Sequence, residues 1–382
     1  MRIKILNTAF VCIFMMALIV PLAFVNVYGG IVSEQENRVL AARPPMSYAF
    51  QHPRDFIKQF DAWFTDNVGF RGHMITWYRQ IDKMVSEGHY EDGQYLILIG
   101  QEGHHYFADV NGSLIPKFQG KSFLSDGQLS GMSGGLNRIK AYLDERNIPL
   151  IVMFCTDKET IYPEYYPRTI KRGPEPVQLT IITEYVQNHT DIDLFNIMEC
   201  LVVAKESYPV FDKAGDAAGI LSHYNEIGAF FAYQELMKHI NAYLPEIKAF
   251  TIDDVNITYR DRGIYPNIPD VHLKQDIEYS RLETDVFDNV NLNHPSQGIV
   301  FENNDSSLPT ILFMRDSYTG TGNYLSRYIP QQFGKTVLIH WNNMAYLDEY
   351  IELFKPDIVV FESAERALPG FAETIRATWG SY

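Results

Sequence analysis

Thr310-Ile-Leu-Phe-Met-Arg-Asp-Ser-Tyr318 begins as an apolar run and ends on polar residues. The residues from Thr310 to Met314 do not alternate with polar ones, which is typical of a strand buried on both faces of a sheet. A glycine-rich turn, Thr319-Gly-Thr-Gly322, comes next, and a segment with helical potential follows at 323–329. The pattern predicts a strand, a turn and a helix, with Ser317 at the carboxyl end of the strand.

Apolar runs and helical periods alternate along most of residues 91–382. Strands are predicted at 95–99, 104–108, 148–155, 192–194, 310–314, 335–340 and 357–361. Helices are predicted at 129–146, 179–186, 197–205, 225–244, 323–329 and 345–353. The alternation indicates an α/β fold with a parallel sheet between two helical layers. Residues 249–308 are rich in Asp, Asn and Pro, and we expect an insertion over the sheet edge there.

The N-terminal residues 1–30 have the composition of a membrane segment. Arg2 and Lys4 precede an apolar run from Ile5 to Val27, which is long enough to span a bilayer and longer than the apolar core of a signal peptide. Basic residues before the run and acidic residues after it predict a cytoplasmic amino terminus. No clear cleavage site follows. We therefore expect a retained transmembrane signal anchor, with the remainder of the chain outside the cytoplasm, in the periplasm or at the cell exterior.

Residues 31–90 are expected to form a linker and a helical lead-in to the α/β domain. Arg43-Pro-Pro45 stiffens the linker. Apolar residues then recur at helical spacing on both sides of a turn at Gly69, which predicts two amphipathic helices. We interpret the aromatic stripe of the first helix as packing rather than as a platform for sugar rings; it consists of Phe56, Phe60, Trp63 and Phe64.

The composition argues against some classes of partner and site. The 382-residue chain is 46% apolar, as a globular protein is, and its net charge of −15 argues against nucleic-acid binding because no basic stripe offsets it. The three cysteines, Cys12, Cys155 and Cys200, form no C-x-x-C pair and no cluster at zinc spacing. We therefore expect no metal site, and the spacing does not support a disulfide between Cys155 and Cys200.

Ser317 is the candidate nucleophile. A hydroxyl at the carboxyl end of a buried strand, before a helix, lies where backbone N–H groups, here those around Ser317 and Tyr318, can face a developing oxyanion. Asp-Ser after a strand is also a common helix cap, which is the alternative interpretation. A serine nucleophile needs a base, and of the eleven histidines His223 is best placed, just before the helix predicted at 225–244. In the alternative, Ser222 or Asn225 caps that helix and His223 packs beside it.

Other polar residues are predicted at the same sheet edge. His340 ends the strand after that of Ser317 and is the rival base. Asp157 and Lys158 follow the strand predicted at 148–155, and Glu362, Glu365 and Arg366 follow the last strand. The residues expected in the vicinity of the substrate or the oxyanion are Asp316, Tyr318, Asp157, Lys158, Arg366 and His340.

Several stretches, ordered over nearly the whole chain, together carry a resemblance to a known family. They are Glu34-Gln-Glu-Asn-Arg38, Phe64-Thr-Asp-Asn-Val-Gly-Phe-Arg71, Ile99-Gly-Gln-Glu-Gly103, Asp157-Lys-Glu-Thr-Ile-Tyr-Pro-Glu-Tyr-Tyr-Pro167, His223-Tyr-Asn-Glu-Ile-Gly-Ala-Phe230, Asp316-Ser317 and Lys355-Pro-Asp-Ile-Val-Val-Phe-Glu-Ser-Ala-Glu-Arg366. The chain thereby resembles the SGNH-hydrolase-like acetyltransferases of bacterial exopolysaccharide modification, which include the alginate O-acetylation proteins AlgJ and AlgX and DHHW-type proteins. The resemblance implies an SGNH-hydrolase-like (flavodoxin-like) fold.

Carried over residue by residue, the resemblance implies that Ser317 carries the acyl group and that His223 is its base. The family's histidine motif is Asp-x-His-Trp, whereas this chain has Leu221-Ser222-His223-Tyr224, so the orienting aspartate is missing from its place. Asp216 and Asp212, in the preceding loop, are the candidates for that role. An orienting carboxylate is worth about 10⁴ in rate in a serine protease, so its absence weakens the expectation of activity.

The expected function is transfer of acetyl groups to hydroxyls of an extracytoplasmic polysaccharide through a Ser–His acyl-enzyme. The resemblance implies a membrane-bound O-acyltransferase as the partner that delivers the acetyl group. We expect no cofactor, because coenzyme A is not expected outside the membrane. Two alternatives stay open. One is an acetylesterase that uses the same residues with water as acceptor, and the other is a catalytically idle polysaccharide-binding or scaffold protein of an export complex, which Leu221 favours.

Overall fold

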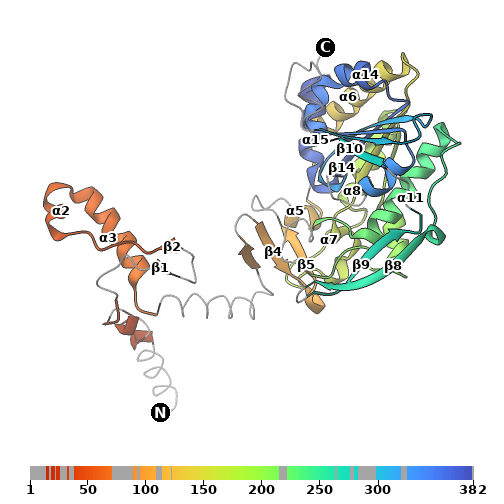
Figure 1. Ribbon diagram of the computed structural model, residues 1–382. Helices are drawn as coiled ribbons and strands as arrows, with labels where there is room; N and C mark the ends of the chain where they lie inside the picture. Colours follow the sequence, from red (N-terminus) through yellow and green to blue (C-terminus); the bar gives the residue numbers. More distant parts are fainter. Residues whose placement is uncertain are drawn as a thin grey trace. The chain divides into compact units, whose positions relative to one another are not determined.

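The computed structural model describes residues 14–16, 19–21, 23–25, 32–33, 38–70, 89–92, 95–108, 114–121, 123–214, 222–262, 265–275, 279–282, 298–319 and 325–380. The chain divides into two compact units, Met1–Ser86 and Glu87–Tyr382. The second of these contains the sheet edge at which the candidate residues are predicted (Figure 1).

The first unit contains two helices and a short strand pair. Strands β1 (Val32–Ser33) and β2 (Arg38–Val39) are antiparallel, and helices α2 (Met46–Gln51) and α3 (Pro53–Asn67) follow. Helix α3 carries the aromatic stripe, within which the rings of Phe56 and Phe60 lie 5.9 Å apart, and only Trp63 of the stripe is buried. The second helix predicted in this region, after Gly69, lies outside the described residues.

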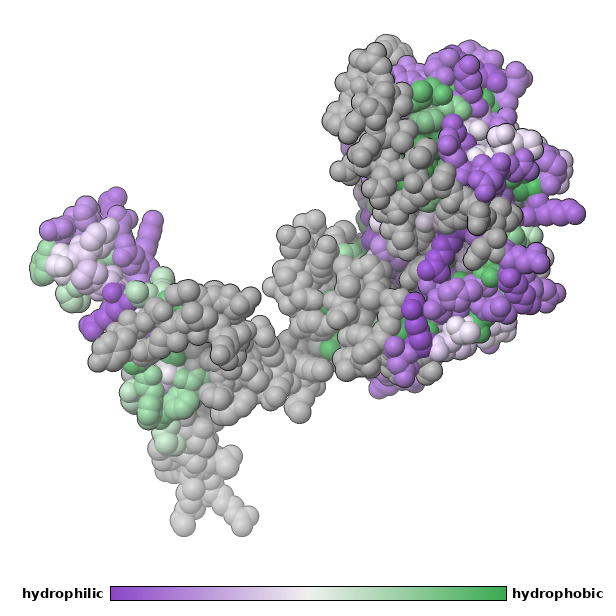
Figure 2. Space-filling model, viewed as in Figure 1, coloured by the Kyte–Doolittle hydropathy of each residue, from purple (hydrophilic) through white to green (hydrophobic). Residues whose placement is uncertain are grey.

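The surface of this unit is partly hydrophobic. Phe50 is 90% exposed, and Met46 and Ile57 are exposed as well. Figure 2 shows hydrophobic residues among those described on this unit's surface. Within the described ranges, no helix combines the length and the apolar character needed to cross a bilayer. Most of the run from Ile5 to Val27, on which the predicted anchor rests, lies outside these ranges.

The second unit is built on a mixed, mostly parallel sheet. Among the described residues the sheet has seven strands, in the order β10-β11-β13-β12-β14-β6-β7. Strands β13, β12, β14, β6 and β7 are mutually parallel, while β10 and β11 are antiparallel additions at one edge. The bounds are β6 Leu150–Cys155, β7 Asp193–Asn196, β10 Tyr279–Leu282, β11 Gly298–Asn303, β12 Thr310–Arg315, β13 Lys335–His340 and β14 Ile358–Ala364.

The antiparallel edge corrects the prediction of a parallel sheet. Only residues 304–309 join β11 to β12, whereas a parallel crossover needs a dozen or more residues. Strand β11 therefore runs opposite to β12 and β13. Both antiparallel strands fall within 249–308, so part of the predicted insertion belongs to the central sheet.

Two hydrophobic cores lie on the two faces of this sheet. Along β12, Ile311 and Phe313 belong to one core, and Leu312 and Met314 belong to the other. Side chains of successive strand residues point to opposite faces, so an uninterrupted apolar strand requires cover on both sides. The first core includes side chains of α9 (Met198–Ala204), α11 (Glu226–Tyr243) and α13 (Leu325–Tyr328). The second includes α6 (Asp126–Asp144), α8 (Gln178–His189), α14 (Leu347–Phe354) and α15 (Leu368–Trp379).

Smaller elements complete this unit. Strands β3 (His89–Asp92), β4 (Tyr95–Ile99) and β5 (His105–Ala108) form an antiparallel sheet. Strands β8 (Val255–Arg262) and β9 (Tyr265–Leu273) form a hairpin beside α11 (Figure 1). The short helices are α5 (Leu114–Phe118) and α7 (Lys158–Ile161), with 3₁₀ turns η1 Gln101–Gly103, η2 Pro163–Tyr165, η3 Ile252–Asp254, η4 Ser317–Thr319, η5 Ile329–Gln331, η6 Trp341–Tyr346 and η7 Glu365–Ala367.

Candidate active site

Ser317 lies in the 3₁₀ turn η4, directly after β12. The side chain of Asp316 shapes this turn: its Oδ1 accepts a hydrogen bond from the backbone N–H of Tyr318 at 2.8 Å, and its Oδ2 accepts one from the N–H of Ala364. Asp316 is buried, and these bonds tie the end of β12 to the end of β14. The hydrogen bonds of Asp316 therefore hold in place the turn that carries Ser317, the candidate nucleophile.

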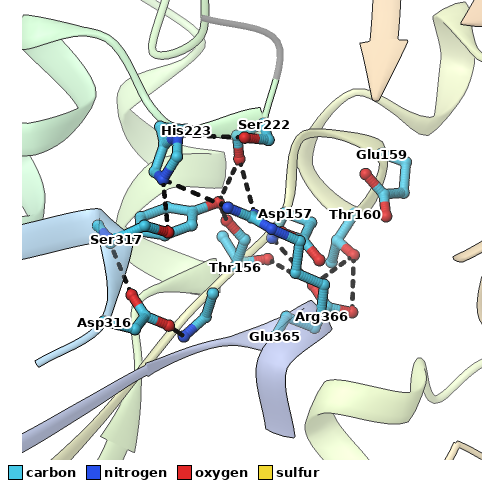
Figure 3. A network of polar contacts seen from close by, with 12 residues as sticks. Thr156, Asp157, Glu159, Thr160, Ser222, His223, Asp316, Ser317, Glu365 and Arg366 are labelled. Atoms are coloured by element: carbon cyan, nitrogen blue, oxygen red, sulfur yellow. Dashed lines mark hydrogen bonds and ion pairs between the residues drawn. The ribbon is translucent and has the colours of Figure 1, made fainter. Parts of the chain in front are cut away.

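His223 stands just before α11. The side chain of Asn225 caps this helix by accepting hydrogen bonds from the N–H groups of Ile227 and Gly228, both at 3.1 Å. A Cβ at Gly228 would lie 2.3 Å from the carbonyl oxygen of Val210. Only glycine therefore allows the first turn of α11 to pack this closely against the backbone of Val210. In this position the Nε2 of His223 lies 2.9 Å from the Oγ of Ser317 (Figure 3).

The other nitrogen of the imidazole faces a hydroxyl. The Nδ1 of His223 lies 3.1 Å from the Oγ of Ser222. Ser222 was considered only as a helix cap in the sequence, but Asn225 is the cap and Ser222 occupies the position beside the imidazole. The signal that could have identified Ser222 is its place next to the histidine, at the variable position of the Asp-x-His motif.

Of the two acids predicted to orient His223, the structure describes Asp212 but not Asp216. The described contacts of Asp212 run to Asn225, whose Nδ2 lies 3.2 Å from Oδ1, and to Lys158, whose Nζ donates to the Asp212 carbonyl oxygen at 2.6 Å. Asp212 thus braces the start of α11. Asp216 lies outside the described residues, as does Leu221.

Arg366, in the turn η7 after β14, reaches the same imidazole. Its Nη2 lies 3.3 Å from the Nε2 of His223, and its Nη1 contacts Asp157 Oδ1 and donates to the carbonyl oxygen of Ser222 at 3.0 Å. Figure 3 shows the guanidinium lying between His223 and Asp157. Burial disfavours the charged guanidinium, but the Asp157 carboxylate and Tyr318 raise the pKa of Arg366 above its ordinary value.

Tyr318 connects these groups beneath the imidazole. Its hydroxyl oxygen lies 2.6 Å from the carbonyl oxygen of Ser222, 2.9 Å from that of Thr156 and 3.3 Å from Arg366 Nη1. The guanidinium carbon of Arg366 sits 5.0 Å from the centre of the Tyr318 ring, a cation–π arrangement. Burial raises the pKa of Tyr318 well above its ordinary value, so the hydroxyl stays protonated. The backbone that carries His223 is thus held through one carbonyl by two buried donors.

The oxyanion prediction needs one correction. The backbone N–H of Tyr318 was expected to face a developing oxyanion, but it already donates to Asp316 Oδ1. A backbone group that closes a turn in this way is not directed at substrate. The guanidinium of Arg366 places a cationic group next to the Nε2 of His223.

Asp157 belongs to a buried charge cluster behind the site. The Nζ of Lys117 lies 2.8 Å from Asp157 Oδ2, 3.0 Å from Glu159 Oε1 and 3.1 Å from Glu365 Oε1. Burial acts against the charge of Asp157, but Lys117 and Arg366 lower the pKa of its carboxyl. Burial raises the pKa of Glu159 to about 7. Lys117 was missed in the sequence, where it is one polar residue in the otherwise apolar stretch Leu114-Ile-Pro-Lys-Phe118.

Lys158 and Glu362 are buried, and their side chains form hydrogen bonds with backbone groups. The Nζ of Lys158 donates to the carbonyl oxygens of His105 at 2.7 Å, Asp212 at 2.6 Å and Lys213 at 2.9 Å. Burial lowers the pKa of Lys158 to about 7, but three carbonyl acceptors match the three N–H groups of an ammonium. The Oε2 of Glu362 accepts from the N–H of Asp316 at 3.2 Å, and burial together with Asp316 raises the pKa of Glu362 well above its ordinary value.

His340, the predicted rival base, lies at the end of β13, where its side chain contacts a backbone group. It pairs with Arg315 across β12 and β13, and its Nδ1 accepts from the backbone N–H of Asn342 at 3.1 Å, which caps the turn η6. Burial lowers its pKa. The contact with Ser317 Oγ at 2.9 Å is made by His223. Cys155 and Cys200 are free thiols, and within the described ranges no group of His, Cys, Asp and Glu side chains could hold a metal ion.

The chain is similar to several solved structures. PatB1 from Bacillus cereus, in a structure with a sulfonyl adduct, superposes with a TM-score of 0.54 at 15% identity, over 75% of this chain and 98% of that chain. A DHHW family protein from Eubacterium siraeum gives 0.52 at 12% identity, over 77% and 98%. The O-acetyltransferase domain of AlgJ from Pseudomonas putida gives 0.42 at 12% identity, over 73% and 98%. No family model and no curated protein sequence matches the chain. The first two structures show that this chain shares their fold.

Proposed function

We propose that this protein is an O-acetyltransferase that transfers acetyl groups to hydroxyls of a polysaccharide through an acyl-enzyme on Ser317. The observation that carries the proposal is the distance of 2.9 Å between Ser317 Oγ and His223 Nε2 at the carboxyl edge of a mostly parallel sheet. The sequence motifs that resemble SGNH-hydrolase-like acetyltransferases, and the fold shared with PatB1 and a DHHW family protein, support the same reaction class.

The first half of the reaction acetylates the serine. His223 Nε2 takes the proton of the Ser317 hydroxyl while Oγ attacks the carbonyl carbon of an acetyl ester or thioester donor, and the carbonyl π electrons move to oxygen. The guanidinium of Arg366 supplies positive charge near this oxyanion. The carbonyl then re-forms, the bond to the leaving group breaks, and the leaving group takes the proton from Nε2.

The second half repeats these steps with a sugar hydroxyl as nucleophile. His223 takes the proton of the sugar hydroxyl, whose oxygen attacks the acetyl carbon on Ser317, and the proton returns to Ser317 Oγ as the ester bond to the enzyme breaks. The products are an O-acetylated sugar and the free serine. We place the reaction outside the cytoplasm, on a chain held by an N-terminal transmembrane helix, with a membrane-bound O-acyltransferase as the acetyl-delivering partner and without a cofactor.

Turnover of a chromogenic acetyl ester tests the reaction class. We expect the full chain to release the chromophore, and we expect Ser317→Ala and His223→Ala to lose the activity. His340→Ala is the matched control, because His340 caps η6, and it should retain activity. Equal rates in wild type and Ser317→Ala would overturn the proposal. Added sugar oligomers separate transfer from hydrolysis: an acetyltransferase forms acetylated sugar, whereas an acetylesterase forms only acetate.

A scaffold without catalysis is the second candidate function. The observation that favours it is Leu221 at the position where the family motif has aspartate. A scaffold would bind polysaccharide oligomers equally well as wild type and as Ser317→Ala, with no turnover in either. Turnover that depends on Ser317 excludes it.

A further inference from the structure

The imidazole of His223 has different neighbours at its two nitrogens. Nε2 faces the Oγ of Ser317 at 2.9 Å and the Nη2 of Arg366 at 3.3 Å. Nδ1 faces the Oγ of Ser222 at 3.1 Å. A neutral imidazole carries one hydrogen, and the partners at the two nitrogens determine which nitrogen bears it.

These partners differ in the hydrogen bonds that they can make. The guanidinium of Arg366 has only N–H donors and no acceptor, so it can donate to a bare Nε2 but cannot accept from a hydrogen on Nε2. The hydroxyls of Ser222 and Ser317 can each donate or accept, and neither imposes a choice. Arg366 is therefore the one neighbour in these contacts that discriminates between the two tautomers, and it favours the hydrogen on Nδ1.

This tautomer is the one that a base for Ser317 requires. The lone pair of Nε2 must face the Ser317 hydroxyl, and Nδ1 must carry the hydrogen. In a serine protease a carboxylate on the Nδ1 side holds that state. Here a neutral hydroxyl, that of Ser222, occupies the described contact on that side.

We propose that Arg366 favours the Nδ1–H tautomer of His223 from the Nε2 side. The catalytic meaning of this assignment rests on the proposed acetyl transfer, but the tautomer itself is a property of the protein without substrate. When Nε2 accepts the serine proton, the Arg366 N–H loses its acceptor there. The acetyl oxygen becomes negative at the same step and offers the N–H a new one.

The guanidinium is held in a fixed orientation for this task. Its Nη1 contacts Asp157 Oδ1 and the carbonyl oxygen of Ser222, and its guanidinium carbon lies 5.0 Å from the centre of the Tyr318 ring. Asp157 is held in turn by Lys117 at 2.8 Å. The two terminal nitrogens of Arg366 therefore have separate roles: Nη1 anchors the side chain and the His223 backbone, and Nη2 faces the imidazole.

Nitrogen NMR of the full chain tests the assignment directly. With ¹⁵N-labelled histidine, long-range ¹H–¹⁵N correlations distinguish a nitrogen that bears hydrogen from one that does not, and His223→Asn identifies the His223 signals. We expect wild type to show hydrogen on Nδ1 and a bare Nε2. In Arg366→Lys, which keeps a cation for Asp157 but has no planar fork, we expect signals of the Nε2–H form. Ser222→Ala, which keeps Arg366, should retain the wild-type tautomer.

Two results would overturn the inference. One is hydrogen on Nε2 in wild type, which needs no variant to fold. The other is an unchanged Nδ1–H tautomer in Arg366→Lys when the remaining histidine signals show an intact fold.

Acetylation of Ser317 is measured separately, and we expect Arg366→Lys to slow it at least about tenfold. If Ser317 is acetylated while the resting imidazole carries hydrogen on Nε2, only this inference fails. If the tautomer is as expected but Ser317 never acquires an acetyl group, the proposed function fails.

Discussion

The Nε2 of His223 lies 2.9 Å from the Oγ of Ser317, although 94 positions separate the two residues in the chain. Both sit at the ends of regular elements, Ser317 after β12 and His223 before α11. Buried groups hold both ends: Asp316 braces the turn of the serine, and Tyr318 and Arg366 hold the backbone of the histidine. Such bracing keeps a nucleophile and its base within reach before substrate binds.

Removal of the Ser222 hydroxyl should have a small effect on the reactivity of Ser317. Ser222→Ala removes the hydroxyl that lies 3.1 Å from His223 Nδ1 but leaves the Ser222 carbonyl contacts intact. A neutral hydrogen bond contributes about 1 kcal/mol, so we predict that acetylation of Ser317 slows by about tenfold or less. Ser133→Ala, a buried serine of α6, is the control and should leave the rate unchanged. A loss of about a thousandfold or more would contradict this view of Ser222.

The Tyr318 hydroxyl should contribute to stability and to the position of the base. Tyr318→Phe removes the single hydrogen of a buried hydroxyl whose oxygen lies 2.6 Å from the carbonyl oxygen of Ser222 and 2.9 Å from that of Thr156, so one of these carbonyls loses its donor. We predict a loss of about 1–3 kcal/mol in the free energy of unfolding, measured in urea, together with slower acetylation. Tyr224→Phe removes a longer contact, 3.4 Å to the Tyr318 carbonyl, and should cost less than about 1 kcal/mol. Equal losses in the two variants would contradict the prediction.

Lys117 should be one of the most sensitive positions for folding. Lys117→Met leaves the carboxylates of Asp157, Glu159 and Glu365 buried without their shared cation. Because an unpaired buried charge cannot be screened by water, we predict a loss of about 3–5 kcal/mol in unfolding free energy.

The matched control for this variant is a surface lysine. Lys140 pairs with Asp144 across one helical turn, and the two side chains are 28% and 54% exposed. Lys140→Met should therefore cost less than about 1 kcal/mol. If Lys117→Met unfolds at the same urea concentration as Lys140→Met, the cluster does not stabilise the fold in the way described.

The raised pKa of Glu159 predicts a pH-dependent stability. Burial raises this pKa from 4.5 to about 7, so between these values the folded state binds more protons than the unfolded state. Stability from this group is therefore present at low pH and is lost as the pH rises through about 7. Glu159→Gln removes the titration. We predict that wild type loses up to about 3 kcal/mol relative to Glu159→Gln between about pH 5 and pH 8. A difference that is constant, or that grows in favour of wild type, would contradict this.

The parallel strands were predictable because both of their faces are buried. Strand β13 has the predicted bounds, and β12 differs by one residue, since an uninterrupted apolar run is hard to mistake when flanked by polar turns. Helix α15 was not predicted. Its place against α6 depends on Gly135, where a Cβ would lie 2.4 Å from the Cγ2 of Ile375. The antiparallel strands β10 and β11 were not predicted, because they lie in a polar region without a clear strand pattern. Their direction in the sheet depends on the length of the connection to β12.

The site was predictable only in part. Ser317 and His223 were each expected at an element end, but it was the family resemblance that paired them as nucleophile and base. The contacts of Arg366 could not be predicted, because they depend on how the turn η7 directs one side chain after β14. Lys117 lies 40 positions before Asp157, and no local pattern connects the two.

The central claim is that Ser317 carries the acetyl group, and mass analysis of quenched reactions tests it most directly. The full chain is mixed with an acetyl ester, quenched with acid, weighed intact and digested to locate the modification. We predict one added acetyl group on Ser317 in wild type, none in Ser317→Ala, and a strongly reduced amount in His223→Ala. Acetylation that is absent from Ser317 in wild type, or that is equal in wild type and His223→Ala, would contradict the account.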